Sequence, residues 1–320
     1  MLLERLKFVQ RGVARRDIVP GLTHFRIKDG RVTGFNGSYS LSAPVDISFN
    51  AAPNAERFVR ALDSCEDVIS LTLDGNKLRV RSGDFHTAIP CVDLSDVPET
   101  IPEGVTVPPH GSILTALESL KPFVGVDASR PWATGVLFAR QSAFATNNVV
   151  VCEYWLGADF PHTVNVPSGI IDEVVRVDEE LSLMQIAGGS ITFHYADGRW
   201  IKSQLLALNW PNILHVLDSA WQGANMRPIP QGLAAAGEKL ARQGDKRENR
   251  IYLRGTDVAA DKEGETRVEI VGVPDRGCYN TRYFNDMLKV ATLTDFHKYP
   301  DAVPFIGDRI RGAIVGMYEK

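Results

Sequence analysis

The chain has 320 residues, 44% of them hydrophobic and 23% charged, which is typical of a globular protein with two or three domains. No apolar run reaches the roughly 18–20 residues that cross a bilayer, and the charged N-terminal stretch lacks the apolar core of a secretory signal, so a cytoplasmic location is expected. The net charge of −4 does not by itself predict a nucleic-acid partner, and four widely spaced cysteines indicate neither a zinc site nor disulfide bonds.

The first third of the chain predicts two helices, each followed by a β-hairpin. Apolar residues recur at spacings of three and four in the first helix, which is the period of an amphipathic helix. Asp29-Gly30 lies between two strand-like runs and predicts a tight hairpin turn, and Asn54 is the predicted N-cap of the second helix. The predicted elements are a helix over 2–16, a hairpin over 23–37, a helix over 52–66 and a hairpin over 68–83.

The middle third repeats this order of elements. Ser168 is the predicted N-cap of its second helix, and Asp197-Gly198 is the predicted turn of its last hairpin. The predicted elements are a helix over 110–123, a hairpin within 135–148, a helix over 166–177 and a hairpin over 190–208.

Residues 135–148 read GVLFARQSAFATNN, in which two apolar runs flank a short polar break. This pattern predicts a hairpin whose turn is the polar break. The paired Asn147 and Asn148 that follow leave three interpretations open: a catalytic loop, a ligand-binding edge, or a turn between strands.

The last third predicts a helix over 230–247, strands over 250–273 and a helix over 279–292 with Asn280 as its N-cap. The N-caps predicted for the second helix of each third are 114 and 112 residues apart, which indicates three tandem copies of one unit. Each copy combines two helices with antiparallel strands, so the predicted fold class is α+β. The predicted domains are 1–104, 105–218 and 219–320.

Residues that could carry catalysis do not form a recognisable site in the sequence. None of the seven histidines pair at metal-ligand spacing, and neither a nucleophile motif nor a phosphate-binding loop is present. The acidic clusters at 172–173 and 178–180 are interpreted as solvated faces. We therefore predict no catalytic residue, metal or cofactor, while a hydrolase or transferase that uses carboxylates with His194 or His215 stays open as an alternative.

Positive charge is concentrated on the predicted helices. Residues 2–16 hold five basic residues against Glu4, a net charge of +4, and the six helical segments together carry +5, which leaves −9 for the rest of the chain. A basic face on an acidic protein suits contacts with a phosphate backbone that carry no sequence information. The residues predicted to face DNA are Arg5, Lys7, Arg11, Arg15, Arg16, Arg57, Arg60, Lys121, Arg130, Arg176, Lys239, Arg242, Lys246, Arg247 and Lys289.

An ordered set of segments resembles the bacterial sliding clamps, the beta subunit of DNA polymerase III. The closest resemblance lies in RPWATGVLFARQSAFATNNVVVCEYW (130–155), NVPSGIIDEVVRV (165–177) and SQLLALNWPNILHVLD (203–218), with further matches in 73–93 and 247–261. The resemblance implies three tandem clamp domains per chain and a head-to-tail homodimer that closes a ring around duplex DNA. It also implies a processivity factor for a DNA polymerase, without catalytic activity or cofactor, and residues 77–90 and 250–270 as candidates for the dimer interface.

The resemblance further implies a hydrophobic pocket that binds short linear motifs of the polymerase and the clamp loader. The matching positions are Thr146, Asn148, Val149, Val151, Pro211, His215, Val216, Ile314, Val315 and Met317. Asn148 stands where the family usually has Gly, and His215 where it usually has a basic residue. The chain is also shorter than typical cellular members, which suggests a bacteriophage version that acts in the host cytoplasm. A clamp-fold adaptor that no longer encircles DNA is a further alternative.

Overall fold

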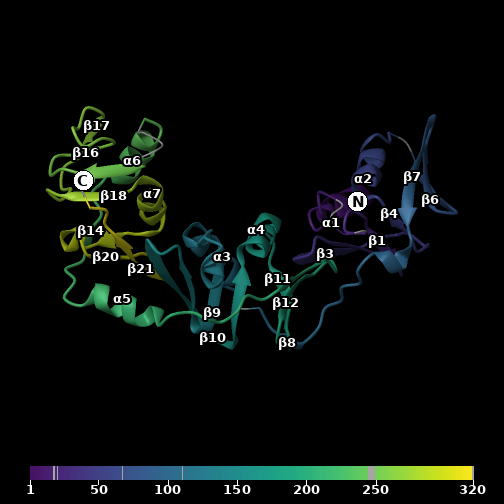
Figure 1. Cartoon of the computed structure of the whole chain (residues 1–320), viewed down its shortest axis with the longest axis horizontal. Helices are drawn as coiled ribbons and strands as arrows, with labels where there is room; N and C mark the ends of the chain where they lie inside the picture. Colours follow the sequence, from purple (N-terminus) through teal and green to yellow (C-terminus); the bar gives the residue numbers. More distant parts are fainter. Residues whose placement is uncertain (17–18, 20, 67, 110, 244–248, 319–320) are drawn as a thin grey trace. The chain divides into compact units, whose positions relative to one another are not determined.

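The computed structural model describes residues 1–16, 19, 21–66, 68–109, 111–243 and 249–318. It contains two compact units (Figure 1). Unit 1 comprises Met1–Pro109 and Arg176–Leu205, and unit 2 comprises His110–Val175 and Leu206–Lys320. This division into two units does not test the three domains that the repeats predict, which stay a prediction. None of the described helices combines the length and the apolar composition that a bilayer-crossing segment needs.

Unit 1 is built on two antiparallel sheets. In the larger sheet β3 pairs with β13, and the partners Leu41 and Ile201 are both fully buried. The pairing therefore joins segments that lie far apart in the sequence. The larger sheet has the order β1 (Arg26–Lys28), β2 (Arg31–Phe35), β3 (Tyr39–Pro44), β13 (Trp200–Gln204), β12 (Ser190–Tyr195), β11 (Leu181–Ile186) and β8 (Val105–Val107). The smaller sheet has the order β4 (Ala52–Pro53), β7 (Phe85–Val92), β6 (Lys77–Ser82) and β5 (Ser70–Asp74).

Two helices of unit 1 confirm the positions predicted for them. Helix α2 (Ala55–Asp63) begins after Asn54, whose side chain accepts a hydrogen bond from the backbone N–H of Arg57 at 3.1 Å. Helix α1 (Leu2–Gln10) packs on β2 and β3 beside α2. It ends at Gln10, six residues before the predicted end at residue 16. Just beyond this end, Gly12 approaches the sheet so closely that a Cβ atom there would lie 2.8 Å from Leu41 N.

The tight turn between β1 and β2 is confirmed. Asp29 and Gly30 have φ values of 50° and 72°, the left-handed pair that a two-residue hairpin turn requires. Two glycines further along unit 1, Gly104 and Gly188, differ sharply in their surroundings. Gly104 has φ +97° and a Cβ atom there would lie 2.2 Å from Ile186 O, whereas Gly188 has open space around it.

We therefore expect Gly104→Ala to lower the free energy of unfolding by about 1–3 kcal/mol, because the substitution combines left-handed strain with a backbone clash. Urea unfolding measures this change. Gly188→Ala is the matched control and should change stability by less than about 0.5 kcal/mol. Equal effects of the two substitutions would contradict the close approach at Gly104.

Unit 2 also contains two antiparallel sheets. The larger has the order β14 (Arg227–Pro228), β19 (Leu293–Thr294), β20 (Ala302–Ile306), β21 (Ile310–Val315), β10 (Val150–Pro167) and β9 (Gly135–Thr146). The smaller has the order β17 (Arg267–Glu269), β16 (Asp257–Ala259), β15 (Arg250–Leu253) and β18 (Gly277–Asn280). The helices are α3 (Ile113–Leu120), α5 (Ile213–Trp221), α6 (Leu233–Ala241) and α7 (Thr281–Val290), and α4 (Ser168–Val177) begins in this unit.

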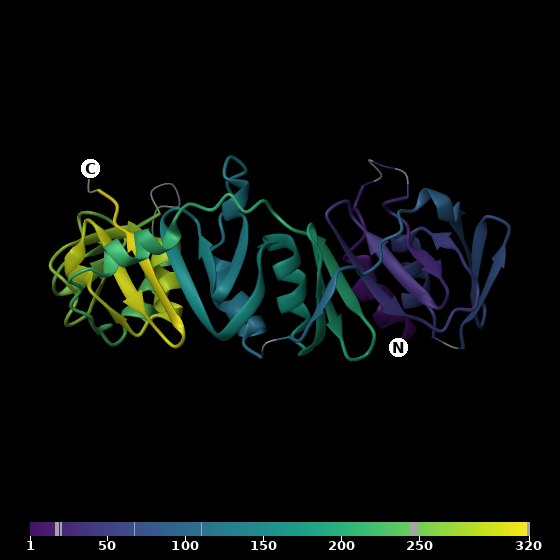
Figure 2. The ribbon, with the colours of Figure 1, turned by 90° about the horizontal axis from the view of Figure 1, so that it is seen from below.

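The larger sheet of unit 2 is covered on both faces. On one face α3 and α7 contact the strands, and Phe123, which follows α3, lies 6.5 Å from Phe305 of β20, centroid to centroid. On the other face α5 packs against β20 and β21. Figure 2 shows α5, in green, across the yellow strands. The two faces therefore have different neighbours, and the alternation along each strand decides which side chains meet α5.

The predicted hairpin within residues 135–148 is wrong. These residues form one long strand, β9, up to Thr146, and the polar break is an irregularity at which Arg140 adopts φ 54° and the pairing with β10 changes register. The turn lies instead at the paired asparagines. Asn147 Oδ1 accepts from the N–H groups of Val149 and Val150 at 3.0 and 2.8 Å, so the interpretation as a turn between strands is confirmed.

The remaining predicted helices are present, with α7 capped by Asn280 at 3.3 Å from Tyr283 N and α4 beginning at Ser168 itself. The end of the helix predicted over 230–247, residues 244–247, lies outside the described residues. Helix α5 was not predicted. Ile213, Leu217 and Ala220 have helical spacing and are buried, but the segment is short, and the predicted boundary between the second and third domains, at 218–219, falls within it.

Candidate functional site

The face of unit 2 that carries α5 brings together part of the predicted peptide pocket. Val151 of β10 pairs with Thr146 of β9 and with Ala313 of β21, so these three side chains share the face. Val151 is 6% exposed and belongs to one apolar cluster with Leu217 of α5. The complete cluster of buried residues is Leu137, Phe144, Val151, Ile213, Leu217, Ala220 and Ala313.

Val216 and Val315 form an exposed apolar rim beside this cluster. Val216 on α5 is 47% exposed, and Val315 of β21, two residues beyond Ala313 and thus on the same face, is 46% exposed. Asp218 leaves α5 on the opposite flank from Val216 and lies 3.6 Å from Arg311. Ala313 lies under α5, and Arg311 and Val315 lie on opposite sides of Ala313 along β21. Since Arg311 is on the Asp218 side of α5, Val315 is on the other side, together with Val216. We call this flank the Val216 flank.

Three polar or imino positions of the predicted pocket lie at the surface around the Val216 flank. Pro211 and His215 are exposed near the start of α5, and Asn148 is exposed at the β9–β10 turn with φ 70°. Asn148 N donates to Thr146 Oγ1 at 3.1 Å, which ties the turn to β9. Val149 is half-buried in the same turn.

Ile314 and Met317 are placed away from this flank. Ile314 is fully buried and pairs with Val150, which puts its side chain on the sheet face covered by α3 and α7. Met317 packs near Tyr252 and Cys278, at the smaller sheet. A shift of one residue in the register of the C-terminal strand moves every side chain to the other face. Ala313, which pairs with Val151, therefore takes the position on the α5 face that was predicted for Ile314.

The sequence interpretation also missed Leu137, Ile213 and Leu217, which form the floor under the rim. The helical spacing of Ile213 and Leu217 was a usable signal. The sequence holds no signal that the side chain of Leu137 points to the α5 face, because every residue of GVLF (135–138) is apolar.

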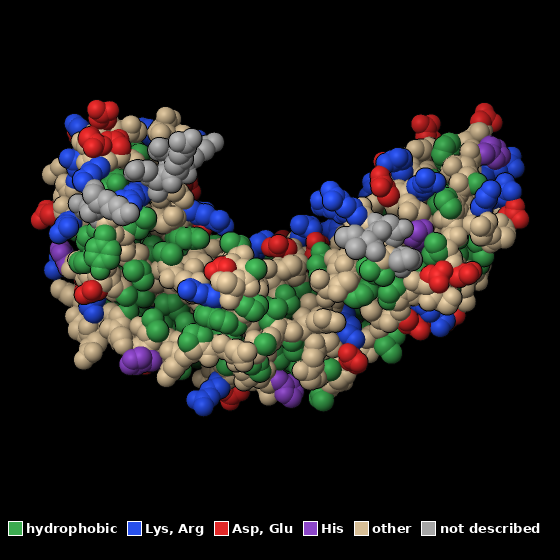
Figure 3. Space-filling model, in the orientation of Figure 1, with side chains coloured by type: hydrophobic (Ala, Val, Ile, Leu, Met, Phe, Trp, Pro, Cys, Tyr) green, Lys and Arg blue, Asp and Glu red, His purple; other side chains and the backbone are tan. Residues whose placement is uncertain are grey.

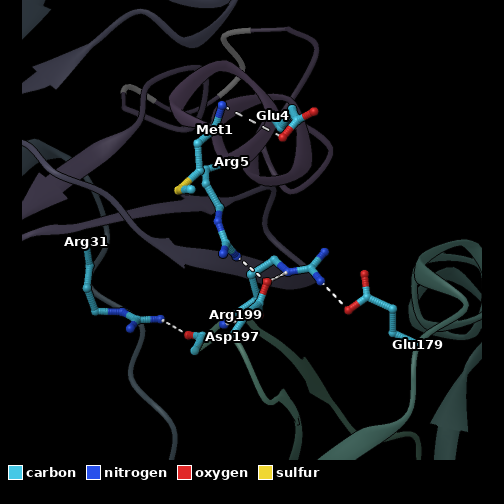
Figure 4. A network of polar contacts seen from close by, with 8 residues as sticks. Met1, Glu4, Arg5, Arg31, Glu179, Asp197 and Arg199 are labelled. Atoms are coloured by element: carbon cyan, nitrogen blue, oxygen red, sulfur yellow. Dashed lines mark hydrogen bonds and ion pairs between the residues drawn. The ribbon is translucent and has the colours of Figure 1, made fainter.

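Arg5, predicted to face DNA, is engaged in an ion-pair network in unit 1 (Figure 4). Its guanidinium donates to a carboxylate oxygen of Asp197, in the turn between β12 and β13. Arg199 bonds the same oxygen at 2.6 Å and reaches Glu179 at 2.5 Å, and Arg31 donates to Gly198 O at 2.8 Å. The network fixes α1 on the larger sheet, so the charge of Arg5 is largely neutralised within the fold.

Burial alone would raise the pKa of Asp197, but hydrogen bonds from the backbone N–H of Arg199 and from the guanidinium groups of Arg5 and Arg199 hold the pKa below its ordinary value. A lowered pKa in the fold means that the unfolded chain binds a proton more readily. The stabilisation is therefore present at neutral pH and is lost as the pH falls through the folded-state pKa.

Asp197→Asn should accordingly lower the free energy of unfolding by about 1–2 kcal/mol at pH 7, because two arginines lose a charged acceptor. The difference from wild type should shrink as the pH falls below about 4. Urea unfolding at a series of pH values tests both statements. A difference that stays constant down to pH 3 would contradict the charged role of Asp197.

Several other residues predicted to face DNA also have local partners. Arg11 lies over the ring of Phe8, with its Cζ atom 5.2 Å from the ring centroid. Arg176 is exposed in the last turn of α4 and also interacts within the fold. Four further residues form ion pairs with a neighbouring carboxylate, namely Lys7 with Asp63 at 2.6 Å, Arg60 with Glu56 at 2.5 Å, Lys121 with Asp172 at 2.8 Å and Lys289 with Asp286 at 3.1 Å. Their charges are partly compensated.

The remaining basic residues of the predicted set are exposed and form no ion pair with any other residue that the structure describes. They are Arg15, Arg16, Arg57, Arg130, Lys239 and Arg242. Lysine and arginine side chains gather over α1 and α2 in Figure 3. Lys246 and Arg247 lie outside the described residues. The exposed set is the part of the prediction that is free to meet an anionic partner.

The residues considered for an enzyme do not form a reactive group. His194 contacts Gln185 Oε1 at 2.8 Å, and burial followed by the charge of Arg31 lowers its pKa. His215 is exposed on α5. The thiol of Cys152 is fully buried, and this burial raises its pKa. Glu173 is buried, unlike the solvated face expected for its cluster. Among the residues described, no three His, Cys, Asp or Glu side chains come together to hold a metal ion.

Comparison with solved structures gives full-length matches. The sliding clamp of Bartonella birtlesii bound to griselimycin superposes with a TM-score of 0.83 at 15% identity, covering 99% of this chain and 97% of that one. The clamp of Bacillus subtilis superposes with a TM-score of 0.82 at 15% identity, covering 100% of this chain and 97% of that one. The Helicobacter pylori beta clamp bound to a DNA ligase peptide superposes with a TM-score of 0.81 at 14% identity, covering 99% of this chain and 98% of that one. The chain has the α+β fold of these sliding clamps. No family model and no curated protein sequence matches the chain. The clamp fold confirms the predicted α+β fold class, and repeated domains are consistent with it.

Proposed function

We propose that the protein is a DNA sliding clamp, a processivity factor that holds a polymerase on duplex DNA and has no catalytic activity of its own. The observation that carries the proposal is the match to clamp structures over nearly the whole length of both chains. Three clamp domains, 1–104, 105–218 and 219–320, would supply half of a ring, which a second copy would complete. Such a clamp would act in the cytoplasm, where DNA is replicated.

Contacts with DNA would be made by the exposed basic residues without ion pairs. Arg15 and Arg16 follow α1, and Arg57 lies in the first turn of α2, so a phosphate backbone would meet guanidinium groups that need not abandon a carboxylate first. Such contacts release counterions and do not depend on base sequence. Arg5, held by Asp197, would support α1 in place of contacting DNA.

Partner proteins would dock on the Val216 flank of α5. Two exposed valines over a closed apolar floor suit the large side chains of a short linear motif, and the polar Asn148 and His215 would lie at its edge. One structural neighbour is bound to a DNA ligase peptide, which supports peptide binding as a use of this fold. The polymerase and the clamp loader are the partners proposed here.

Edge strands of opposite charge support a head-to-tail homodimer. β5 is an edge of the smaller sheet in unit 1, and residues 70–82 carry Asp74 against three basic residues, a net charge of +2. β17 is an edge of the smaller sheet in unit 2, and residues 261–269 carry four acidic and two basic residues, a net charge of −2. Pairing of unlike edges would cover both unpaired strands.

Electron microscopy of the purified protein, together with sedimentation, tests the proposal. We expect a dimer that forms closed rings, and protein that stays with nicked circular DNA through gel filtration but runs off once the same DNA is linearised. A stable monomer at micromolar concentration would overturn the clamp proposal. Rings that form but never retain circular DNA would favour the clamp-fold adaptor.

A further inference from the structure

Helix α5 has a second flank, opposite the Val216 flank. Successive residues of a helix are rotated by about 100°, so Val216 and Asp218 point to opposite sides of the buried Leu217. On the Asp218 side the sheet continues from Ala313 to Arg311, and from Val151 to Glu153, which pairs with Arg311. Trp155 follows on the same face, and its backbone N–H donates to Arg309 O at 2.7 Å.

A hollow of about 330 Å³ opens on this side, at the tip of the β20–β21 hairpin. Its walls are mainly apolar and include Trp155, a residue that is 52% exposed although large aromatic residues are usually mostly buried. Figure 3 shows apolar side chains gathered over the face of unit 2 around β20 and β21. The hollow is lined by Glu153, Trp155, Ile306, Gly307, Arg309, Ile310 and Arg311.

The charges around the hollow are unequal in their pairing. Glu153 is satisfied within the fold, because one oxygen accepts from Ser142 Oγ and the other from Arg311 Nε, each at 2.6 Å. Arg309 has no carboxylate partner among the residues that the structure describes. Its guanidinium donates to Leu156 O at 2.8 Å and lies 5.2 Å from the centroid of the Trp155 ring. One cation without a counter-charge therefore borders an apolar cavity.

We propose that this hollow is a second peptide-docking site, which binds a segment in which a large apolar side chain stands next to a carboxylate. The apolar side chain packs against Trp155 and Ile306, and the carboxylate pairs with Arg309. Tryptophan and arginine are among the residues that are enriched at binding hot spots. The two flanks of α5 lie on one unit, so a partner with two motifs can occupy both. The proposal does not depend on DNA binding.

Fluorine NMR of 5-fluorotryptophan-labelled protein tests the site, with Trp155→Phe used to assign the Trp155 signal among the five tryptophans. The probes are the peptide acetyl-GSDLFDGS-amide and its neutral counterpart acetyl-GSNLFNGS-amide. We expect the acidic peptide to shift the Trp155 signal saturably and to bind about tenfold more tightly than the neutral one. Arg309→Gln should remove this tenfold preference.

The titrations are repeated in the Val216→Asp variant, which blocks the opposite flank. An unchanged response there supports the second site, whereas loss of the Trp155 shift would place the peptide on the Val216 flank and overturn the proposal. Failure of both peptides to shift the Trp155 signal up to their solubility limit overturns it as well. A tenfold preference that survives Arg309→Gln would exclude Arg309 as the carboxylate partner.

Discussion

Replacing Val216 with Asp is expected to weaken binding of a tail peptide of the proposed polymerase partner by at least tenfold while leaving the fold intact. Val216 is 47% exposed, so a carboxylate there stays hydrated in the free protein and loses that hydration only when an apolar motif covers it. Fluorescence anisotropy of a labelled peptide measures the loss, and circular dichroism verifies the fold.

Two further variants separate binding from folding. Leu214→Asp changes a residue that is 41% exposed on the Asp218 side of α5 and should leave binding of the polymerase tail peptide unchanged. Val151→Asp buries a charge beside Phe144 and Leu217 and should cost about 4 kcal/mol or more of stability. If Val216→Asp bound the peptide as tightly as wild type, the Val216 flank would lose its proposed role.

Replacing Arg15, Arg16 and Arg57 together with Gln is expected to lower the yield of protein loaded on nicked circular DNA on the order of tenfold. Each phosphate contact that is removed should also reduce the magnitude of the slope in a plot of the logarithm of the DNA-binding constant against the logarithm of the salt concentration by about one. Retention of already loaded rings should persist, because linkage to a closed circle does not depend on these contacts. Gel filtration over a range of salt concentrations measures both quantities.

The matched control removes the same charge from residues with internal partners. Lys7, Arg60 and Lys121, each replaced with Gln, lose cations that already pair with Asp63, Glu56 and Asp172. This variant should load several-fold better than the first, although its net charge is identical. Equal losses in the two variants would indicate a general effect of net charge and would contradict a specific role for Arg15, Arg16 and Arg57.

Local features of the fold could be predicted where one residue decides the backbone. Asn54 and Asn280 cap helices because their side chains accept a hydrogen bond from a free backbone N–H of the first turn. Asp29-Gly30 makes a turn because both residues adopt the positive φ that a tight hairpin turn needs. The long strand β9 could not be predicted in the same way. A polar break within an apolar run has the same pattern in a hairpin and in a bulged strand, and only the pairing with β10 distinguishes them.

The candidate site was predictable in its composition more than in its geometry. Val151 and Val216 were found by resemblance, but the choice between Ile314 and Ala313 depends on strand register, which an apolar segment does not reveal. The partner of Arg5 could not be foreseen at all, because Asp197 is 192 residues away in sequence. Charge counts on helices identify candidate cations, and the fold decides which of them are already neutralised.

The pairing of β3 with β13 has a consequence for how the chain folds during its synthesis. β3 ends at Pro44, but its neighbour in the sheet is not complete until Gln204 has been made. At the usual rates of translation that interval is about 10–30 s. Throughout it the buried side of β3, including Leu41, belongs to an unfinished sheet with one open edge. A nascent chain of this protein therefore exposes its first sheet to chaperones, and to other nascent copies, long before the first hundred residues can close their core.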